Sequence, residues 1–361
     1  MIQIDLSAPP APDRSGATPS FYGLGRPRLS QLMEAAGQPR FRADQLYAWI
    51  YQRKVRRPDA MSDMPLAFRA RLPDVIGLSL PAVHSVLSSP DQSTHKFVLE
   101  LSDGRHVECV SMRSARGLTM CLSSQVGCAL KCSFCATGLM GLVRNLRAEE
   151  IVAQVMVMGE HAGWRDDRFN IVYMGMGEPL ANYDPVLESI RILRDERGLK
   201  LGARRITVST SGVVPQIRRL SEEGMALGLA VSLHATTDAT RSELVPLNRR
   251  WPIRELLDAA HAYGEKTGRR VTLEYTLIAG VNDTPADAER LSAFARELPS
   301  KINIIPYNPV PGLPWQRPTP ESVTQFAESL YPRAPAVTVR DTMGGEIWAA
   351  CGQLGGLSPE A

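Results

Sequence analysis

Segments with strand-like and helix-like patterns alternate through most of this chain, and the alternation limits the possible folds more than any other feature. Short apolar segments predict strands, and segments with helical spacing of apolar residues lie between them. Strand–helix units in series predict a parallel sheet with right-handed crossovers, and six units fit a partial (β/α)6 barrel better than a closed barrel of eight. The expected strands are 118–123, 170–174, 205–209, 227–232, 271–278 and 302–306, and the expected helices are 148–158, 184–194, 214–223, 253–267 and 286–298.

The segments before and after these units have other patterns. A stretch rich in Pro, Ser and Ala begins the chain, and a helical pattern follows that Pro58 and Pro65 interrupt. Asp103-Gly104 joins two strand-like runs, which is a strong hairpin signal. An α/β fold is therefore expected with a disordered tail (1–24), a small helical domain (25–80), a β-hairpin extension (81–114), the partial barrel (115–335) and a C-terminal strand and tail (336–361).

Composition restricts the compartment and the partners only loosely. Without a stretch of about 18 apolar residues or a secretory signal, no membrane association is expected. Five of the six cysteines lie within 109–135, which indicates metal or redox chemistry in the reducing cytoplasm rather than a disulfide framework. The net charge is only +3, but Arg53, Lys54, Arg56 and Arg57 form a basic run, which is either a solvated helix end or an RNA phosphate contact.

Three of these cysteines follow the first expected barrel strand as a C-x3-C-x2-C array, Cys128, Cys132 and Cys135. One loop of this length can wrap a single metal centre. Cysteine thiolates hold iron–sulfur clusters, and three of them leave one iron of a cubane cluster without a protein ligand. A zinc site is the alternative, since Cys132 and Cys135 form a C-x2-C pair, but no second pair or nearby histidine follows. With zinc bound, the chain would be a non-catalytic zinc-bearing RNA-binding module.

With Phe134 directly before the last cysteine, the array resembles the signature of the radical S-adenosylmethionine (SAM) superfamily. The resemblance implies a [4Fe-4S] cluster on Cys128, Cys132 and Cys135. It also implies that the open iron binds SAM, which electron transfer then cleaves to a 5′-deoxyadenosyl radical.

Further blocks resemble one family of this superfamily. The blocks are FRADQLYAWIYQ, MGMGEPLANYD, ITVSTSGVVP, VSLHATTD, IPYNPVPG and AACGQL, and they resemble the RlmN family over roughly residues 25–356. That family methylates carbon 2 of an adenine in 23S rRNA and in certain tRNAs. The N-terminal block favours it over the related Cfr group, which methylates carbon 8. The resemblance further implies an electron donor such as flavodoxin and a monomeric, cytoplasmic enzyme.

The resemblance also implies roles for single residues. SAM contacts are expected at strand ends from Gly177, Glu178, Ser209, Ser232, Leu233, His234 and Asn308. A carboxylate such as Glu178 can hold the SAM ammonium by charge-assisted hydrogen bonds.

Two outlying cysteines and one glutamate carry the implied methyl transfer. Cys351 is the expected methyl carrier, Cys121 its resolving partner and Glu108 a general base. Two SAM molecules are consumed per turnover: one methylates Cys351, and the radical from the other activates that methyl group. Whether Glu108 or Cys121 takes the ring proton stays open, and Cys109 is expected to be a packed residue.

One departure from the family pattern concerns the tail. Where the family usually carries Thr-Arg-Gly, this chain has Thr342, Met343 and Gly344. Met343 therefore replaces a positive charge that could contact RNA, which bears on the choice between tRNA and rRNA and not on the cysteine chemistry.

Overall fold

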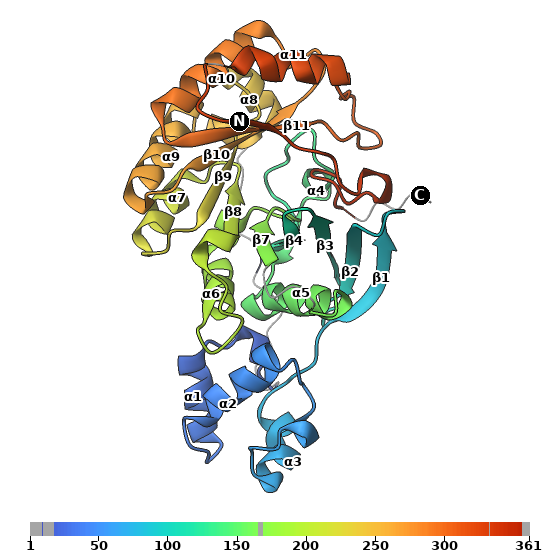
Figure 1. Ribbon diagram of the computed structural model, residues 1–361, viewed down its shortest axis with the longest axis vertical. Helices are drawn as coiled ribbons and strands as arrows, with labels where there is room; N and C mark the ends of the chain where they lie inside the picture. Colours follow the sequence, from blue (N-terminus) through green and yellow to red (C-terminus); the bar gives the residue numbers. More distant parts are fainter. Residues whose placement is uncertain (1–8, 10–17, 165–168, 332, 356–361) are drawn as a thin grey trace.

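The computed structural model describes residues 9, 18–164, 169–331 and 333–355, and in these ranges ten strands form one mixed sheet (Figure 1). Consecutive parallel pairing joins seven of them: the six strands of the predicted partial barrel and the predicted C-terminal strand, β12. They are β4 (Gly117–Cys121), β7 (Phe169–Tyr173), β8 (Ile206–Thr210), β9 (Gly228–Ser232), β10 (Val271–Leu277), β11 (Ser300–Pro306) and β12 (Val337–Val339).

Amphipathic helices connect these strands. In α6, Val186, Leu187, Ile190 and Leu193 are buried at helical spacing, so one face of the helix packs on the sheet. The other helices that follow barrel strands bury apolar residues in the same way, which places the main core between sheet and helices. The helices are α5 (Ala148–His161), α6 (Tyr183–Arg194), α7 (Val214–Glu222), α8 (Asp238–Leu244), α9 (Ile253–Thr267), α10 (Pro285–Glu297) and α11 (Pro320–Leu330).

An antiparallel extension continues the sheet beyond β4. It consists of β1 (Ala82–Ser88), β2 (Thr94–Glu100) and β3 (His106–Ser114), and β3 pairs with β4. The predicted hairpin corresponds to β2 and β3, whereas β1 is a further strand that the sequence analysis did not predict. Its pattern carried little signal, because β1 lies at the sheet edge and its residues are exposed or half-buried.

A second, two-stranded sheet frames the cysteine array. It pairs β5 (Gln125–Gly127) with β6 (Leu142–Asn145), and the short helix α4 (Ala136–Leu139) lies between them. The array thus lies in a loop closed at its base by β5 and β6. Single-turn helices complete the described elements at Phe21–Gly23, Pro58–Ala60, Pro179–Asn182, Ala203–Arg205, Pro246–Arg249 and Gly345–Ile347.

The small helical domain contains α1 (Arg26–Ala35), α2 (Arg42–Tyr47), a π-helical turn (Ala48–Gln52) and α3 (Leu66–Val75). Residues 1–8 and 10–17 of the expected disordered tail lie outside the described residues. For residues 21–23 the expectation is wrong, because the Phe21 and Tyr22 rings are buried and Phe21 packs against Tyr47 and Tyr51. Burial of the Phe21 and Tyr22 rings stabilises residues 21–23 as a single-turn helix.

The basic run connects this domain to α5. Arg56 forms a bidentate ion pair with Glu160 at 2.9 Å, and the Lys54 ammonium lies 3.8 Å from the centroid of a Trp164 ring. Arg53 stacks on Trp49 within the domain. These three basic side chains of the run therefore contact other residues of the same chain. None of the described helices is long and apolar enough to cross a membrane.

Candidate active site

A pocket opens at the carboxyl ends of the parallel strands, where ligand sites form in sheets of this kind. It brings together residues from five strand ends, the cysteine loop and the C-terminal tail. Of the thirteen residues that the sequence analysis assigned to the site, ten line this pocket: Cys128, Cys132, Cys135, Gly177, Glu178, Ser209, Ser232, His234, Asn308 and Cys351. Cys121 lines an adjoining pocket, while Leu233 and Glu108 line neither of the two.

Backbone contacts hold the cysteine loop in shape. The Cys128 amide donates to the carbonyl of Gly141 at 2.9 Å, and the Ser133 amide donates to that of Leu244 at 3.0 Å. Gly127 has a positive φ of 76°, and a Cβ there would lie 1.9 Å from the Gly141 carbonyl oxygen, so only glycine fits the start of the loop. The loop therefore presents its cysteines from a fixed base.

The three cysteines fit an iron–sulfur cluster better than a single zinc ion. Burial raises the pKa of all three thiols, that of Cys128 to about 12, so the thiolate forms need a compensating positive centre. Structural zinc sites usually have four protein ligands, whereas three thiolates can hold a cubane cluster and leave its fourth iron without a protein ligand.

Glu178 and Gly177 lie opposite the cysteine loop, directly after β7. Burial raises the pKa of Glu178 to about 7, although the amides of Leu180 and Ser211 donate to its carboxylate at 3.1 and 2.8 Å. Gly177 has a φ of 95°, and a Cβ there would lie 2.5 Å from the Cβ of Gln125. The backbone of this turn therefore approaches β5 as closely as only glycine allows.

The ends of β8 and β9 supply further polar groups. The hydroxyl groups of Ser209 and Ser232 lie 3.4 Å apart and line the pocket. His234 is held by a hydrogen bond from the Thr276 amide to Nδ1 at 3.0 Å and by an edge contact with Phe134. Burial lowers its pKa to about 3, so the imidazole is neutral. The Leu233 side chain is fully buried, and its carbonyl accepts a hydrogen bond from Arg241.

Arg241, on α8, is a residue that the sequence analysis missed. Its side chain is fully buried, and it donates to the carbonyls of Leu233, Ser232 and Ser211 and to the Asn248 side chain. Burial lowers its pKa to about 10, while the nearby Cys132 thiol opposes that shift. Arg241 therefore ties the ends of β8 and β9 together behind the cysteine loop. No motif in the sequence distinguishes it from a surface arginine of a helix.

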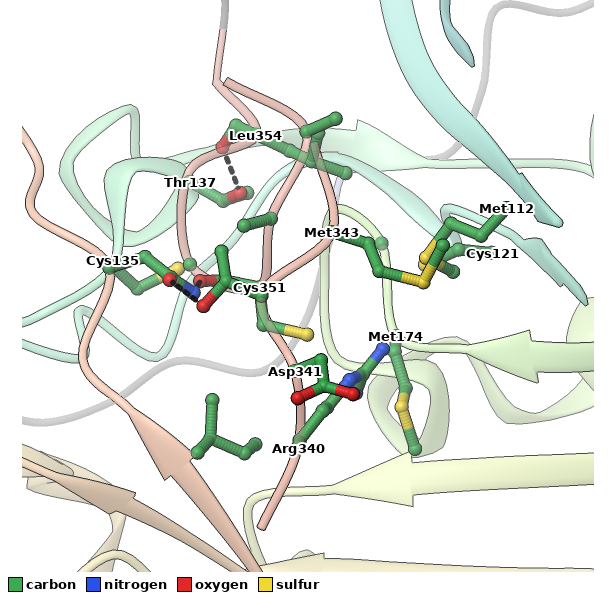
Figure 2. Close-up of a pocket in the computed structure, with 17 residues that line it drawn as sticks. Met112, Cys121, Cys135, Thr137, Met174, Arg340, Asp341, Met343, Cys351 and Leu354 are labelled. Carbon is green, nitrogen blue, oxygen red and sulfur yellow. Dashed lines mark hydrogen bonds between the residues drawn. The ribbon is translucent and has the colours of Figure 1, made fainter. Parts of the chain in front are cut away.

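The tail carrying Cys351 is folded into the active-site region. Figure 2 shows the pocket between Cys351 and Cys121, with the Arg340 and Met343 side chains extending into it. Several contacts hold the tail. The Ala136 backbone amide donates to the Gly352 carbonyl at 2.8 Å, Thr137 donates to the Leu354 carbonyl, and the side-chain amide of Asn308 donates to the Cys351 carbonyl at 3.1 Å. Asn308 thus positions the tail as well as lining the pocket.

Glu108 is buried, not exposed as its strand pattern alone suggests. Its carboxylate lies 3.8 Å from the Lys96 ammonium, and the amide of Gly355 donates to it at 3.0 Å. Burial lowers the pKa of Lys96, and Glu108 opposes that shift. Cys109 is buried on β3 within the core, as the sequence analysis expected.

Two tail residues complete the site. Arg340 follows β12 and is the only lysine or arginine that lines either pocket in the described part of the chain. The charge of Cys351 raises the pKa of Arg340, and burial opposes this effect. Met343 is half-buried beside Met112 and Cys121, and its side chain lines the pocket between the cysteines (Figure 2). The expectation that this position lacks an RNA contact stays a prediction.

Comparison with known proteins matches both parts of the chain. The Radical SAM superfamily profile matches residues 122–291, and a ribosomal RNA large subunit methyltransferase N-terminal domain matches residues 20–77. A dual-specificity RNA methyltransferase RlmN from Anaeromyxobacter sp. is 45% identical over 356 residues, which cover 97% of this chain and 94% of that protein. The chain belongs to the RlmN family of radical SAM RNA methyltransferases.

Other RlmN-family similarities agree. A relative from Symbiobacterium thermophilum is 47% identical over 92% of this chain and 90% of its own length. The crystal structure of a radical SAM methyltransferase from Sphaerobacter thermophilus matches with a TM-score of 0.89 and 46% identity, over 93% of this chain and 98% of that chain. Membership in the RlmN family implies a [4Fe-4S] cluster and the use of SAM. It excludes the reading of the chain as a non-catalytic zinc module.

Proposed function

We propose that this enzyme methylates carbon 2 of an adenine in 23S rRNA and in tRNA, with Cys351 as methyl carrier and Cys121 as resolving thiol. The observation that carries the proposal is the shared pocket: a tail cysteine and a strand cysteine face one cavity that adjoins the cysteine loop. The specificity for carbon 2 is supported by the N-terminal domain match and by the names of the relatives.

The cysteine loop would hold the cluster through Cys128, Cys132 and Cys135. When bound, the cluster supplies the electron that cleaves SAM. Glu178 and the serines at the ends of β8 and β9 would orient the SAM amino acid end, because a buried carboxylate strongly attracts an ammonium group. The neutral His234 ring and the buried Arg241 would keep the strand ends in place around it.

Cys351 would accept a methyl group from one SAM by nucleophilic displacement, which requires its thiolate. The Arg340 guanidinium lines the same pocket as both thiols, so it places a positive charge beside the reacting sulfurs. The methyl group held on the Cys351 sulfur would then lose a hydrogen atom to the radical that cleavage of a second SAM supplies, and its carbon would add to the adenine ring. The adenine must leave its stack to reach this cavity, so an unpaired nucleotide is the expected target.

Cys121 would release the product. Its thiolate attacks the sulfur of Cys351 as the bond from that sulfur to the transferred carbon breaks, which leaves a Cys121–Cys351 disulfide to be reduced. Burial raises the pKa of Cys121 to about 12, so this thiol is protonated until a base removes its proton. Cys121, once deprotonated, and Glu108 are both candidates for removing the ring proton.

The test combines two experiments. Nucleoside analysis of rRNA and tRNA from a deletion strain should show loss of 2-methyladenosine and its recovery with the gene. Cys121→Ala should accumulate a covalent RNA–protein adduct, and Cys351→Ala should form none while still cleaving SAM. Cys109→Ala, a buried cysteine of β3, is the matched control and should turn over without trapping RNA. Recovery of 8-methyladenosine alone would contradict the proposed specificity.

A further inference from the structure

Three exposed side chains of the antiparallel extension gather away from the pocket described above. His84 of β1, Glu100 of β2 and His106 of β3 place their ligand atoms within 4.8 Å of one another. The two imidazole rings lie 4.8 Å apart, centroid to centroid, at 65°. In the described part of the chain, this is the only group of histidine, cysteine and carboxylate side chains compact enough to share one ion.

The strand register creates this group. Glu100 and His106 are direct partners across β2 and β3. On the other side of β2 the register shifts between Val83 and Ser85, so His84 is the extra residue of a β-bulge. Bulges re-aim side chains, and this one adds an imidazole beside the Glu100–His106 pair. Three strands therefore contribute one ligand each.

We propose that His84, Glu100 and His106 bind a divalent transition-metal ion, with Zn²⁺ as the ion that the donor set fits best. Imidazole nitrogens and a carboxylate oxygen are the ligand set of three-ligand zinc sites, in which water takes the fourth position. Tetrahedral bonds of about 2.0–2.1 Å place ligand atoms roughly 3.4 Å apart. The ligand atoms now lie within 4.8 Å of one another, and rotation of the side chains would bring them to this shorter distance.

That rotation costs little. All three side chains are exposed, and within the described ranges none of them forms a hydrogen bond or ion pair with another residue. Neither imidazole has to give up an existing partner when it turns toward the ion. The exposed position also gives an ion from solution direct access.

The site would act as a clamp on the edge of the sheet. β1 is the terminal strand and is held by pairing with β2 alone. An ion bound across β1, β2 and β3 would fasten this edge to the strand that carries Glu108. A ligand that binds only the folded state raises the free energy of unfolding.

Zinc binding to the cluster-loaded, full-length protein tests the proposal, because the cluster then occupies the cysteine loop. Wild type should bind one zinc equivalent more than the double variant His84→Ala/His106→Ala, by calorimetry and metal analysis. Glu100→Gln should also lose that equivalent. His261→Ala, an exposed histidine of α9, is the matched control and should bind zinc as wild type does.

Two further readouts identify the ligands. Zinc X-ray absorption should show nitrogen and oxygen neighbours at about 2.0–2.2 Å and no sulfur at about 2.3 Å. Zinc should raise the midpoint of thermal unfolding of wild type but not of the double variant. Equal zinc binding by wild type and the double variant, or sulfur in the zinc shell, would overturn the proposal.

Discussion

Replacement of Arg241 by methionine tests how the strand ends around the pocket are held. The side chain is fully buried and donates four hydrogen bonds, three of them to backbone carbonyls at the ends of β8 and β9. Methionine has similar length and fills much of the same space but has no donor. Arg241→Met therefore removes the bonds while it leaves most of the packing.

The magnitude follows from two opposing effects. Burial lowers the pKa of Arg241 from 12.5 to about 10, which corresponds to a net cost of roughly 3 kcal/mol for keeping the cation in this site. Four hydrogen bonds to a charged donor stabilise the fold by about 1.5 kcal/mol each at the lower end of their range. The bonds exceed the cost by about 3 kcal/mol, so Arg241→Met should lower the free energy of unfolding by about that amount.

Urea unfolding at neutral pH measures this change, and SAM binding to the cluster-loaded variant measures its effect on the pocket. We expect weaker SAM binding, because Ser211, Ser232 and Leu233 lose their common donor. Arg254→Met is the matched control: its side chain is 69% exposed on α9, and its loss should leave the free energy of unfolding close to that of wild type. An Arg241→Met protein as stable as this control would refute the reasoning.

Two further predictions concern the frame of the cysteine loop. Arg144 of β6 forms a buried ion pair with Glu150 and a partly buried one with Asp103, so Arg144→Met should destabilise the protein by about 3 kcal/mol in urea unfolding. Arg144 lowers the pKa of Asp103, so the stabilisation from this pair is complete above pH 3.8, the ordinary pKa of the carboxyl group. The difference in unfolding free energy between wild type and Arg144→Met should therefore shrink as the pH falls below 3.8. A difference that does not depend on pH would contradict this prediction. Gly177→Ala should weaken SAM binding measured by calorimetry, since its Cβ would lie 2.5 Å from the Cβ of Gln125. Gly224→Ala, also at positive φ but with no atom within 4 Å, should bind SAM as wild type does.

The sequence by itself determined the barrel and the cysteine loop, because both depend on local patterns. Alternating strand and helix periods predict parallel β/α units wherever the apolar spacing is regular, and the C-x3-C-x2-C array needs only one loop. The family resemblance placed residues as distant in sequence as Glu178 and Asn308 at one ligand site, and both line the same pocket. Ligand sites form at the carboxyl ends of parallel strands, and this rule, applied to the expected strand 336–340, would have drawn attention to Arg340.

Only the tertiary structure decided how the remaining groups meet. Burial of Glu108 depends on the tail, whose Gly355 amide covers it, and the role of Met343 depends on the direction of that same tail. In the sequence, Arg241 has the pattern of an ordinary helical arginine. Only the folded chain brings the ends of β8 and β9 within hydrogen-bonding distance of its side chain. His84 joins Glu100 and His106 only through a register shift in an edge strand. Contacts between distant segments set each of these environments, and no local period in the sequence encodes them.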